Sequence, residues 1–523
     1  MPKRSGKAPL DANSTSEFGK GVAEGGIFFT TSSIIRSALS LVLLVVLARL
    51  LQPSSYGLYS IVVALALIMG MNTDFGVGNA LRKKLPESGS GGRTIDIINN
   101  SYFASLSIGL CIFIIGMVAA PYVALYLYHN ASLTLPIRIG FAAVVFSALM
   151  TANAAVLLGL RKGKIAGLGY IAYALSSLIA SVVLVLLGYG VTGALFGLLA
   201  GYVVGFALSL ALVLKHVEYR ITRPSWITLK ELYGFSTPVL ASNMANTGIR
   251  DLGVVLLGIF ATAAIVGNYG AAFKLGSLGD VILVAFMQAL VPAYSYAMSK
   301  KGLSNKVESI YNRSVHYTLV FLLPLLVFLI ASSRALIYLL FSSAYGLAPL
   351  YFAIIATGIV VNIFNRYGSA VVIGAGKVKE YMKYQVIIAA AVAALLFILT
   401  PLLGVMGVLI ALFVVSPVAL DVAFVAFLKK RMNVTLHLRK LFGVAAASLV
   451  LLAMLYYSSQ LLHQRLLSLP VNAAVALVAY PPLLVLLRGA DSNDIGFIES
   501  MGKRMHISAV AKPFARYASM FLA

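Results

Sequence analysis

The 523-residue chain is 60% hydrophobic and 11% charged, with a mean hydropathy of +0.96, which excludes an ordinary soluble globular protein. Its formal charge of +24 is high enough to suggest nucleic-acid binding, unless the basic residues are placed for another reason. A single cysteine, Cys111, excludes an internal disulfide and a cysteine pair for a metal.

Apolar runs follow one another from residue 26 to residue 488. A run of about 20 apolar residues crosses a hydrocarbon core about 30 Å thick as an α-helix. The sequence therefore predicts an all-α polytopic membrane protein with about fourteen transmembrane helices. We expect these helices at residues 26–51, 58–80, 98–120, 136–160, 166–188, 192–214, 235–260, 267–295, 314–336, 347–373, 384–402, 404–428, 441–459 and 470–488.

The basic residues indicate how these helices are oriented. If the N-terminus is cytoplasmic, 32 of the 40 Lys and Arg residues fall in segments on the cytoplasmic side and four on the other side. Cytoplasmic loops carry such an excess of positive charge, so we expect a multi-pass protein of the plasma membrane with both termini in the cytoplasm. The charge then serves orientation and attraction to anionic membrane lipids, and we expect no nucleic-acid partner.

The chain contains an internal repeat. Five features recur at an offset of 213 to 215 residues, which indicates a duplicated unit. They are Arg36 and Arg250, Tyr56-Gly57 and Tyr269-Gly270, Asn99-x-Ser101 and Asn312-x-Ser314, Lys162-x-Lys164 and Lys377-x-Lys379, and Gly190-Val191-Thr192-Gly193 and Gly404-Val405-Met406-Gly407. Each unit holds six predicted helices, an even number, so both enter the membrane in the same direction. Parallel repeats are a transporter architecture, with the substrate site between the two halves.

These observations predict the organisation of the whole chain. We expect a cytoplasmic N-tail (1–25), an N-lobe of six helices (26–215), a cytoplasmic linker (216–234), a C-lobe of six helices (235–428), two further helices (429–488) and a basic, amphipathic cytoplasmic tail (489–523). In the sixth helix, glycines recur every four residues and predict a face for close helix packing, at Gly193, Gly197, Gly201 and Gly205.

Charged residues inside the predicted helices are candidates for function, because a charge at the bilayer centre costs roughly 2.5 to 3.5 kcal/mol on insertion scales. Arg36 and Arg250 are repeat equivalents, so each half offers a guanidinium to a shared site, and guanidinium groups bind phosphate oxygens in a bidentate way. The predicted substrate-binding cations are Arg36, Arg250, Lys274 and Arg366. The predicted coupling or gating carboxylates are Asp74, Asp251 and Asp280.

Each of these charges also has a structural interpretation, as a member of an ion pair or as a residue near a helix end. A pair between helices, for instance Arg36 with Asp251, would break and reform as the two halves move. For Asp421, close to the cytoplasmic end of the twelfth helix, we expect the structural role.

No motif predicts an enzyme. The six histidines are scattered, and the sequence has no HExxH, P-loop, Gly-x-Ser-x-Gly or Cys-x-x-Cys pattern. We therefore expect no catalytic residues, no metal site and no cofactor. A membrane-embedded glycosyltransferase or polymerase is the alternative from another class, which a large outer loop with acidic or histidine clusters would favour. The predicted outer loops are short.

The first two predicted helices carry a family resemblance. The residues that carry it are Leu47-Ala48-Arg49-Leu50-Leu51-Gln52-Pro53, Tyr56-Gly57-Leu58-Tyr59-Ser60, Asp74-Phe75-Gly76-Val77-Gly78-Asn79-Ala80-Leu81-Arg82 and, further on, Gly374-Ala375-Gly376-Lys377. With six plus six helices and two more behind, the chain resembles the polysaccharide exporter and O-antigen flippase family. The superfamily also includes multidrug extrusion proteins and the lipid II flippase. The resemblance covers most of residues 24–490.

The resemblance implies a V-shaped, two-lobe flippase. Such a protein moves a polyprenyl- or dolichyl-linked pyrophosphate oligosaccharide from the cytoplasmic to the outer leaflet by alternating access, for cell-surface polysaccharide or glycoprotein synthesis. It also implies that the four cavity cations engage the pyrophosphate or an acidic sugar. Coupling to H+ or Na+ stays open, and we expect a monomer. The alternative is an ion-coupled multidrug or organic-cation antiporter of the same superfamily, which would favour an acidic cavity and usually has twelve helices.

Overall fold

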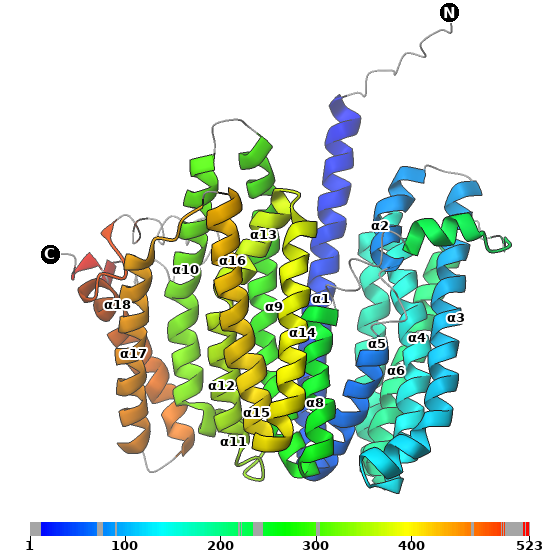
Figure 1. Ribbon diagram of the computed structural model, residues 1–523, viewed down its shortest axis with the longest axis horizontal. Helices are drawn as coiled ribbons and strands as arrows, with labels where there is room; N and C mark the ends of the chain where they lie inside the picture. Colours follow the sequence, from blue (N-terminus) through cyan, green and yellow to red (C-terminus); the bar gives the residue numbers. More distant parts are fainter. Residues whose placement is uncertain are drawn as a thin grey trace, which may run out of the picture. The chain divides into compact units, whose positions relative to one another are not determined.

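The computed structural model is helical throughout the part of the chain that it describes (Figure 1). The described residues are 12–70, 77–88, 92–217, 220, 222–233, 244–299, 304–432, 434–461, 465–492, 494, 496, 516–517 and 519–521. Within them every regular element is a helix, so the predicted all-α class is confirmed. Most of the predicted amphipathic tail, 489–523, lies outside the described residues.

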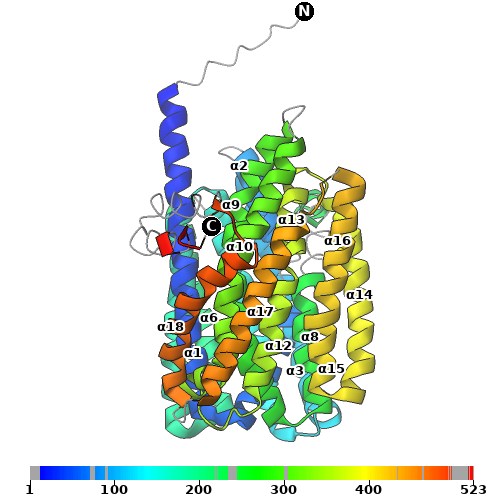
Figure 2. The ribbon, with the colours of Figure 1, turned by 90° about the vertical axis from the view of Figure 1, so that its left-hand side faces the viewer.

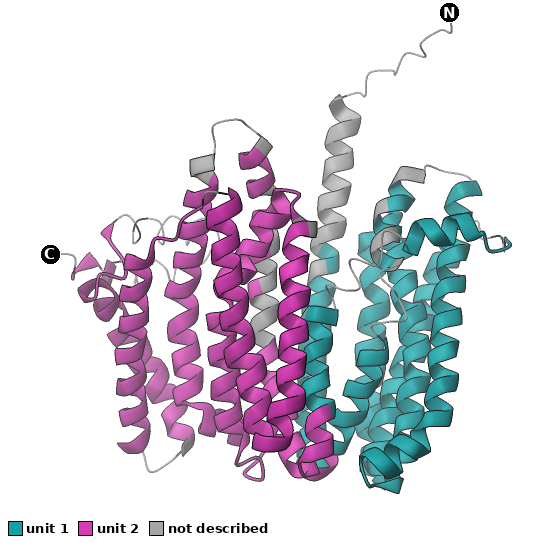
Figure 3. Ribbon diagram, viewed as in Figure 1, with its two compact units in different colours: residues 1–51, 58–255 teal, residues 52–57, 256–523 magenta. Residues whose placement is uncertain are grey.

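The helices form two compact units (Figure 3). Unit 1 comprises residues 1–51 and 58–255. Its long helices are α1 (Ala12–Gly70, of which residues 52–57 belong to unit 2), α2 (Val77–Ser88), α3 (Gly92–Tyr122), α4 (Thr134–Gly159), α5 (Gly163–Leu184) and α6 (Gly190–His216). Its shorter helical segments are η1 (Val123–Leu127), η2 (Ala131–Leu133), η3 (Val185–Tyr189), a helix at 226–233, and η4 (Met244–Gly248).

Unit 2 comprises residues 52–57 and 256–523, so helix α8 (Ile249–Phe260) contributes to both units. Its other helices are α9 (Ala263–Ser299), α10 (Ser304–Ala331), α11 (Ser333–Leu340), α12 (Ala348–Val361), α13 (Ile363–Gly374), α14 (Val378–Leu403), α15 (Val405–Ile410), η5 (Ala411–Val415), α16 (Ser416–Met432), α17 (Leu438–Leu461), η6 (Arg465–Leu467) and α18 (Ser468–Leu486).

The described helices overlap the segments predicted to cross the membrane. Among the described residues, ten segments are long and apolar enough to span a membrane, judged by length and composition. Two of them, Thr31–Gly70 with 40 residues and Gly163–His216 with 54, have about twice the length that one crossing needs. Each contains backbone with positive φ, at Gln52 in the first and at Gly188 and Gly190 in the second. With α8 and α9, these segments overlap the fourteen predicted helices, but residues 71–76 of the second and 235–243 of the seventh lie outside the described residues.

The bend in α1 is confined to Gln52, where φ is 60° and ψ is 168°. Proline disfavours the helical conformation in the residue before it and suits the first turn of a new helix, so the chain bends at Gln52 and is helical again from Pro53. Within unit 2 this turn packs directly on the start of α9. A Cβ on Gly57 would overlap the carbonyl oxygen of Ala263, and a Cβ on Gly267 would overlap that of Pro53.

The two halves of the sequence repeat have the same backbone geometry at equivalent turns. Gly190, the first residue of α6, has φ/ψ of 51°/−131°, and Gly404, just before α15, has 58°/−131°. Both values lie in a region that favours glycine. Three residues further on, Gly193 and Gly407 face the carbonyl end of the preceding long helix, where no side chain would fit. The two helix pairs are therefore built by the same turn.

A second repeated feature is the helix end that precedes α5 and α14. Arg161 and Gly376 occupy equivalent positions, and both have left-handed backbone, with φ of 63° and 69°. The next residues, Lys162 and Lys377, each donate the backbone N–H to the carbonyl five residues earlier, at 2.8 and 3.1 Å. This hydrogen bond is the one that closes a Schellman-type helix end.

A third repeated feature holds the segments that follow the sixth and twelfth predicted helices. Asn99 in α3 donates its side-chain amide to Thr222 Oγ1 at 3.0 Å. Its repeat equivalent, Asn312 in α10, donates to the Thr435 carbonyl at 2.8 Å and accepts the N–H of His437 at 2.9 Å. Because Thr222 and Thr435 are also 213 residues apart, the two halves fasten these segments in the same way.

The glycine face of α6 packs on α5, as the spacing predicts. A Cβ on Gly197 would overlap Ser181, and a Cβ on Gly201 would lie 2.6 Å from the Ser177 side chain. The Ser181 hydroxyl donates to the carbonyl of Ala194 in α6 at 3.0 Å. The two helices therefore touch along their backbones.

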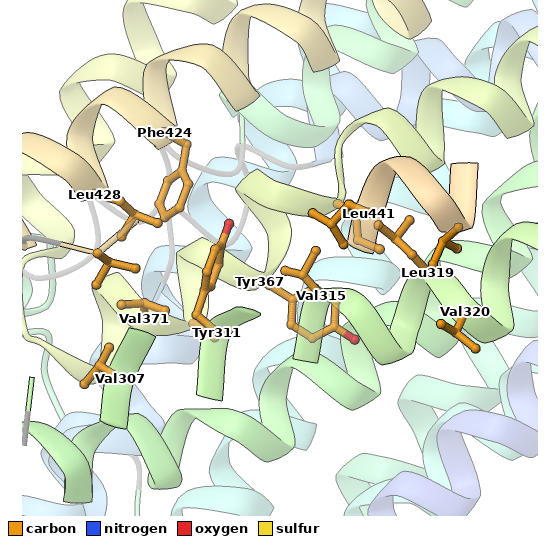
Figure 4. Close-up of a cluster of buried hydrophobic side chains, with 14 of the residues drawn as sticks. Val307, Tyr311, Val315, Leu319, Val320, Tyr367, Val371, Phe424, Leu428 and Leu441 are labelled. Atoms are coloured by element: carbon orange, nitrogen blue, oxygen red, sulfur yellow. The ribbon is translucent and has the colours of Figure 1, made fainter. Parts of the chain in front are cut away.

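The main core of unit 2 lies between α10, α13, α16 and α17, where Tyr311, Tyr367 and Phe424 are each at most 1% exposed (Figure 4). Helices α17 and α18, which follow the repeat, pack beside α10 (Figure 2). The Tyr480 hydroxyl of α18 donates to the Val320 carbonyl of α10 at 2.9 Å. The last two helices are thus part of the core of unit 2.

Candidate functional site

Arg36 lies on α1 where this helix crosses α5 in unit 1. A Cβ on Gly167 of α5 would overlap Ser32, so the two helices are in close contact one turn before Arg36. At the next turn the Arg36 guanidinium carbon lies 5.7 Å from the centre of the Tyr170 ring. This distance is within the range of a cation–π interaction, which contributes about 0.5 to 2 kcal/mol depending on exposure. The phenol ring thus supports the half-buried cation.

Three more tyrosines surround this pair in unit 1. Tyr173, one turn beyond Tyr170 on α5, stacks on Tyr202 of α6 with ring centres 4.4 Å apart. The side chains of Tyr173 and Tyr202 are hydrogen-bonded, and Tyr173 is close enough to Arg36 and Tyr59 to interact with both electrostatically. We call Tyr59, Tyr170, Tyr173 and Tyr202 the tyrosine cluster.

This arrangement combines two binding chemistries. The Arg36 guanidinium has five N–H donors in a planar fork that matches the oxygens of a phosphate group. The tyrosine rings have apolar faces and polar hydroxyl ends, which suit a ligand with both apolar and hydroxyl-bearing surfaces. A cation held on aromatic rings inside a membrane protein is therefore a candidate anion site with an amphipathic wall.

Arg250 and Asp251 lie in the first turn of α8, directly after η4. Arg250 is half-buried, and Asp251 is 6% exposed. Both residues belong to unit 1, as Arg36 does. The pairing of Arg36 with Asp251 stays a prediction.

The two other predicted cations belong to unit 2. Lys274 is an exposed residue of α9, whereas Arg366 is half-buried in α13. Arg366 interacts electrostatically with Asp421 of α16. The two predicted carboxylates that remain are not placed: Asp74 and the side chain of Asp280 lie outside the described residues.

The Asp421 carboxylate accepts a hydrogen bond from a backbone N–H near the start of a helix in unit 2. The tenth predicted helix is not continuous, because α12 ends at Val361 and α13 begins at Ile363. The Asn365 N–H, near the start of α13, donates to Asp421 Oδ1 at 2.8 Å, and the Asn365 side chain donates to Asn362 at 2.9 Å. The Tyr381 hydroxyl of α14 also donates to Asn365. These hydrogen bonds together join α13, α14 and α16 around the break.

A separate charged cluster lies at the start of α17 and just beyond α18. Lys440 Nζ lies 2.7 Å from both Asp491 and Asp494, and the Tyr317 hydroxyl donates to Asp494 at 3.1 Å. His316 Nε2 lies 3.6 Å from Asp494, an ion-pair distance when the ring is protonated. Burial would raise the pKa of Asp494, but its contacts with His316, Lys440 and the Asp491 backbone hold this pKa well below its usual range.

Neither the tyrosine cluster nor the contacts of Asn362 and Asn365 are among the predicted site residues. A signal for the first exists: Gly167, Tyr170 and Tyr173 recur every three residues, which places them near one another on the fifth predicted helix. The contacts of Asn365 had no such signal, because they depend on a break in a helix that reads as continuous.

Comparisons with known proteins are consistent with this architecture. Residues 22–298, more than half of the chain, match the model of the family described as "Polysaccharide biosynthesis protein". The chain is 23% identical over 337 residues to a probable low-salt glycan biosynthesis flippase, Agl15, of Haloferax volcanii, which covers 64% of this chain and 68% of the relative.

Two solved structures share the fold. The lipid II flippase MurJ in an inward closed conformation has a TM-score of 0.70 at 15% identity, over 88% of this chain and 98% of MurJ. An inward-facing multidrug resistance transporter of the MATE family, in the MOP superfamily, has a TM-score of 0.63 at 18% identity, over 76% of this chain and 94% of the transporter. At these identities the likeness concerns the fold alone.

Proposed function

The chain belongs to the polysaccharide biosynthesis protein family, and from this membership we propose that it moves a lipid-linked oligosaccharide from the cytoplasmic to the outer leaflet by alternating access. Three findings support the proposal: the family match, the likeness to a probable glycan biosynthesis flippase, and a fold shared with the lipid II flippase. The expected substrate is a polyprenyl or dolichyl pyrophosphate that carries a sugar chain.

The observation that carries the proposal is Arg36 on the tyrosine cluster. A pyrophosphate carries negative charge on oxygens that a guanidinium binds in a bidentate way. Sugar rings and isoprenoid chains have apolar faces that pack on tyrosine rings, and sugar hydroxyls reach the phenol ends. One wall of unit 1 therefore offers groups for each part of the substrate. We propose that Arg250, Lys274 and Arg366 complete the cation set.

The alternative is an antiporter for organic cations, since the fold is shared with multidrug transporters. Arg36 disfavours that function, because a fixed guanidinium repels a cationic ligand at the tyrosine rings that would otherwise attract it. For coupling to H+ or Na+ we propose Asp74, Asp251 and Asp280 as candidate carboxylates, and we propose that the protein acts as a monomer.

The test compares glycan export by variants in the host cell. Arg36→Ala and Arg250→Ala should each abolish lectin-detected surface glycan while the protein stays at its usual level in the membrane fraction. Arg36→Lys should keep part of the activity, because an ammonium binds phosphate as a point charge. The matched control is Lys430→Ala, which removes an exposed cation. Full export by both alanine variants would exclude the cation site.

A second arm separates the tyrosine wall from the charge. Tyr170→Ala removes the ring under Arg36, and Tyr170→Phe keeps the ring but removes the hydroxyl. If the ring supports the guanidinium, export should fall about five- to tenfold in Tyr170→Ala, which corresponds to about 1 to 1.4 kcal/mol, and remain near normal in Tyr170→Phe. Equal activity of the two variants would show that the cation–π contact does not contribute to export.

A further inference from the structure

The helix at 226–233 has one face fixed to unit 1. Leu229 and Leu232 lie three residues apart and are 7% and 1% exposed. Leu232 packs into the same buried cluster as Leu81 of α2 and Ile97 of α3. Figure 1 shows the helix, in green, running across the ends of α2 and α3 instead of along them. Its inner face is therefore a core face.

Polar contacts hold the helix in this position. Glu231 forms an ion pair with Lys84 of α2. At the other end, the Ser225 N–H donates to Asn100 Oδ1 of α3 at 2.8 Å, next to the contact between Asn99 and Thr222. Because both ends are fastened, the orientation of the outer face is set by unit 1.

The outer face carries large apolar side chains. Trp226 is 76% exposed and Ile227 is 80% exposed. Lys230, also exposed, is four residues from Trp226 and three from Ile227, so the three side chains share one face of the helix. Trp226 is the single tryptophan of the chain. An exposed Trp and Ile on a fixed helix form an apolar surface that no described residue of unit 1 covers.

The charge around this face is positive. Arg220 and Arg223, in the segment before the helix, are exposed. The negative charge of Glu231 is compensated by Lys84 and lies 3.9 Å from Arg93 as well. Contact with Lys84 lowers the pKa of Glu231, so this carboxylate stays ionised and paired. The surface formed by Arg220, Arg223, Trp226, Ile227 and Lys230 is called the linker patch below.

We propose that the linker patch docks on the anionic lipids of the membrane surface. Tryptophan is favoured at the headgroup level of a bilayer, an aliphatic side chain reaches the acyl boundary, and lysine and arginine attract anionic headgroups. The helix lies across helices that cross the membrane and at their ends, so its axis runs near the plane of that surface. The chemistry and the orientation fit the same partner, independently of what the protein transports.

The single tryptophan makes the test direct. The full-length protein is reconstituted in lipid vesicles of phosphatidylcholine with or without phosphatidylglycerol, and one lipid at a time is replaced by its brominated form. Emission from Trp226 should be blue-shifted, protected from acrylamide, and quenched about twofold or more strongly by brominated phosphatidylglycerol than by an equal fraction of brominated phosphatidylcholine.

Charge variants test the preference for anionic lipid. The triple variant Arg220→Gln, Arg223→Gln, Lys230→Gln should bring the quenching ratio of the two lipids down to about one while Trp226 stays quenched by both. Arg220→Lys with Arg223→Lys should keep the ratio, since the attraction depends on charge and not on the guanidinium fork. The control Lys429→Gln with Lys430→Gln removes two exposed cations elsewhere and should leave the ratio unchanged.

Four outcomes would overturn the proposal. Red-shifted emission that acrylamide quenches and brominated lipids do not would place the patch in water. Protection from both quenchers would indicate a protein occupant, either a partner or a second copy. Equal quenching by the two lipids in the unmodified protein, or a ratio that the triple variant leaves unchanged, would refute anionic-lipid recognition.

Discussion

Asp421 illustrates how a charge is accommodated inside this protein. Its carboxylate accepts the Asn365 N–H near the start of α13, at the break that follows Asn362. The first N–H groups of a helix have no partners within it, and the helix dipole favours a negative charge at that end. The break in the tenth predicted helix and the buried Asp421 therefore stabilise each other. The structural role predicted for Asp421 now has a defined geometry.

Asp494 gives a prediction about pH. Its pKa in the folded protein is well below its usual range, so its contribution to stability is present above the unfolded pKa of about 3.9 and is lost as the pH falls toward the folded value. Asp494→Asn should lower the free energy of unfolding by about 1 to 3 kcal/mol at pH 7, because Lys440 loses a buried charged partner.

The measurement is the Tm of the purified protein and the variant between pH 7 and pH 3.5. The difference between the two should be full at pH 7 and pH 5 and should shrink below about pH 4, where the unfolded carboxyl becomes protonated. Glu380→Gln, at an exposed position of α14, is the control and should show little difference at any pH. A difference for Asp494→Asn that is unchanged at pH 3.5 would contradict the prediction.

Helix crossings in this chain are set by glycine. Within unit 2 the turn at Pro53–Gly57 lies against Ala263–Gly267 so closely that carbonyl oxygens occupy the space of two missing Cβ atoms. Close backbone approach is how helices associate in membranes, where the hydrophobic effect does not drive their contact. A backbone carbonyl cannot rotate away as a flexible side chain can, so this crossing has no tolerance for a methyl group.

The crossing yields a prediction about single methyl groups. Gly57→Ala and Gly267→Ala should each destabilise the protein by about 1 to 3 kcal/mol through overpacking. The readout is the yield of monodisperse protein in fluorescence-detected gel filtration, together with the Tm. Gly346→Ala is the matched control, because its Cβ would meet nothing within 4 Å. Normal Tm values for both Gly57→Ala and Gly267→Ala would show that the crossing is looser than described.

At the scale of the whole molecule, the sequence predicted what repeats along the chain. Apolar runs predicted the long helices but not the helix at 226–233, and the shared offset of Gly190 and Gly404 is matched by two turns with nearly the same backbone. Contacts between distant helices were not predictable, because Tyr170 meets Arg36 only through the register of the α1 and α5 crossing. The helix break at Asn362 was not predicted, because the apolar run around it is continuous. Such a run indicates the length of a helix but not the position at which a buried carboxylate interrupts the helix.

The direction of transport depends on orientation, which gives the last prediction. With 32 of 40 basic residues assigned to one side, the positive-inside rule places Arg220 and Lys430 in the cytoplasm and Ala131 and Gly346 outside. In a Cys111→Ser background, an impermeant maleimide should label Ala131→Cys and Gly346→Cys in intact cells, since both positions are exposed. Arg220→Cys and Lys430→Cys should react only after permeabilisation.

Each alternative pattern has a defined meaning. If the two pairs exchange their behaviour, both termini lie outside and the proposed direction of transport is wrong. If Ala131→Cys and Gly346→Cys differ from each other, the helices between them are odd in number, and two parallel six-helix repeats are excluded. Ala131 follows the third predicted helix and Gly346 follows the ninth, so the two positions are equivalent in the repeat. One labelling experiment therefore tests the orientation and the repeat together, without any assumption about the substrate.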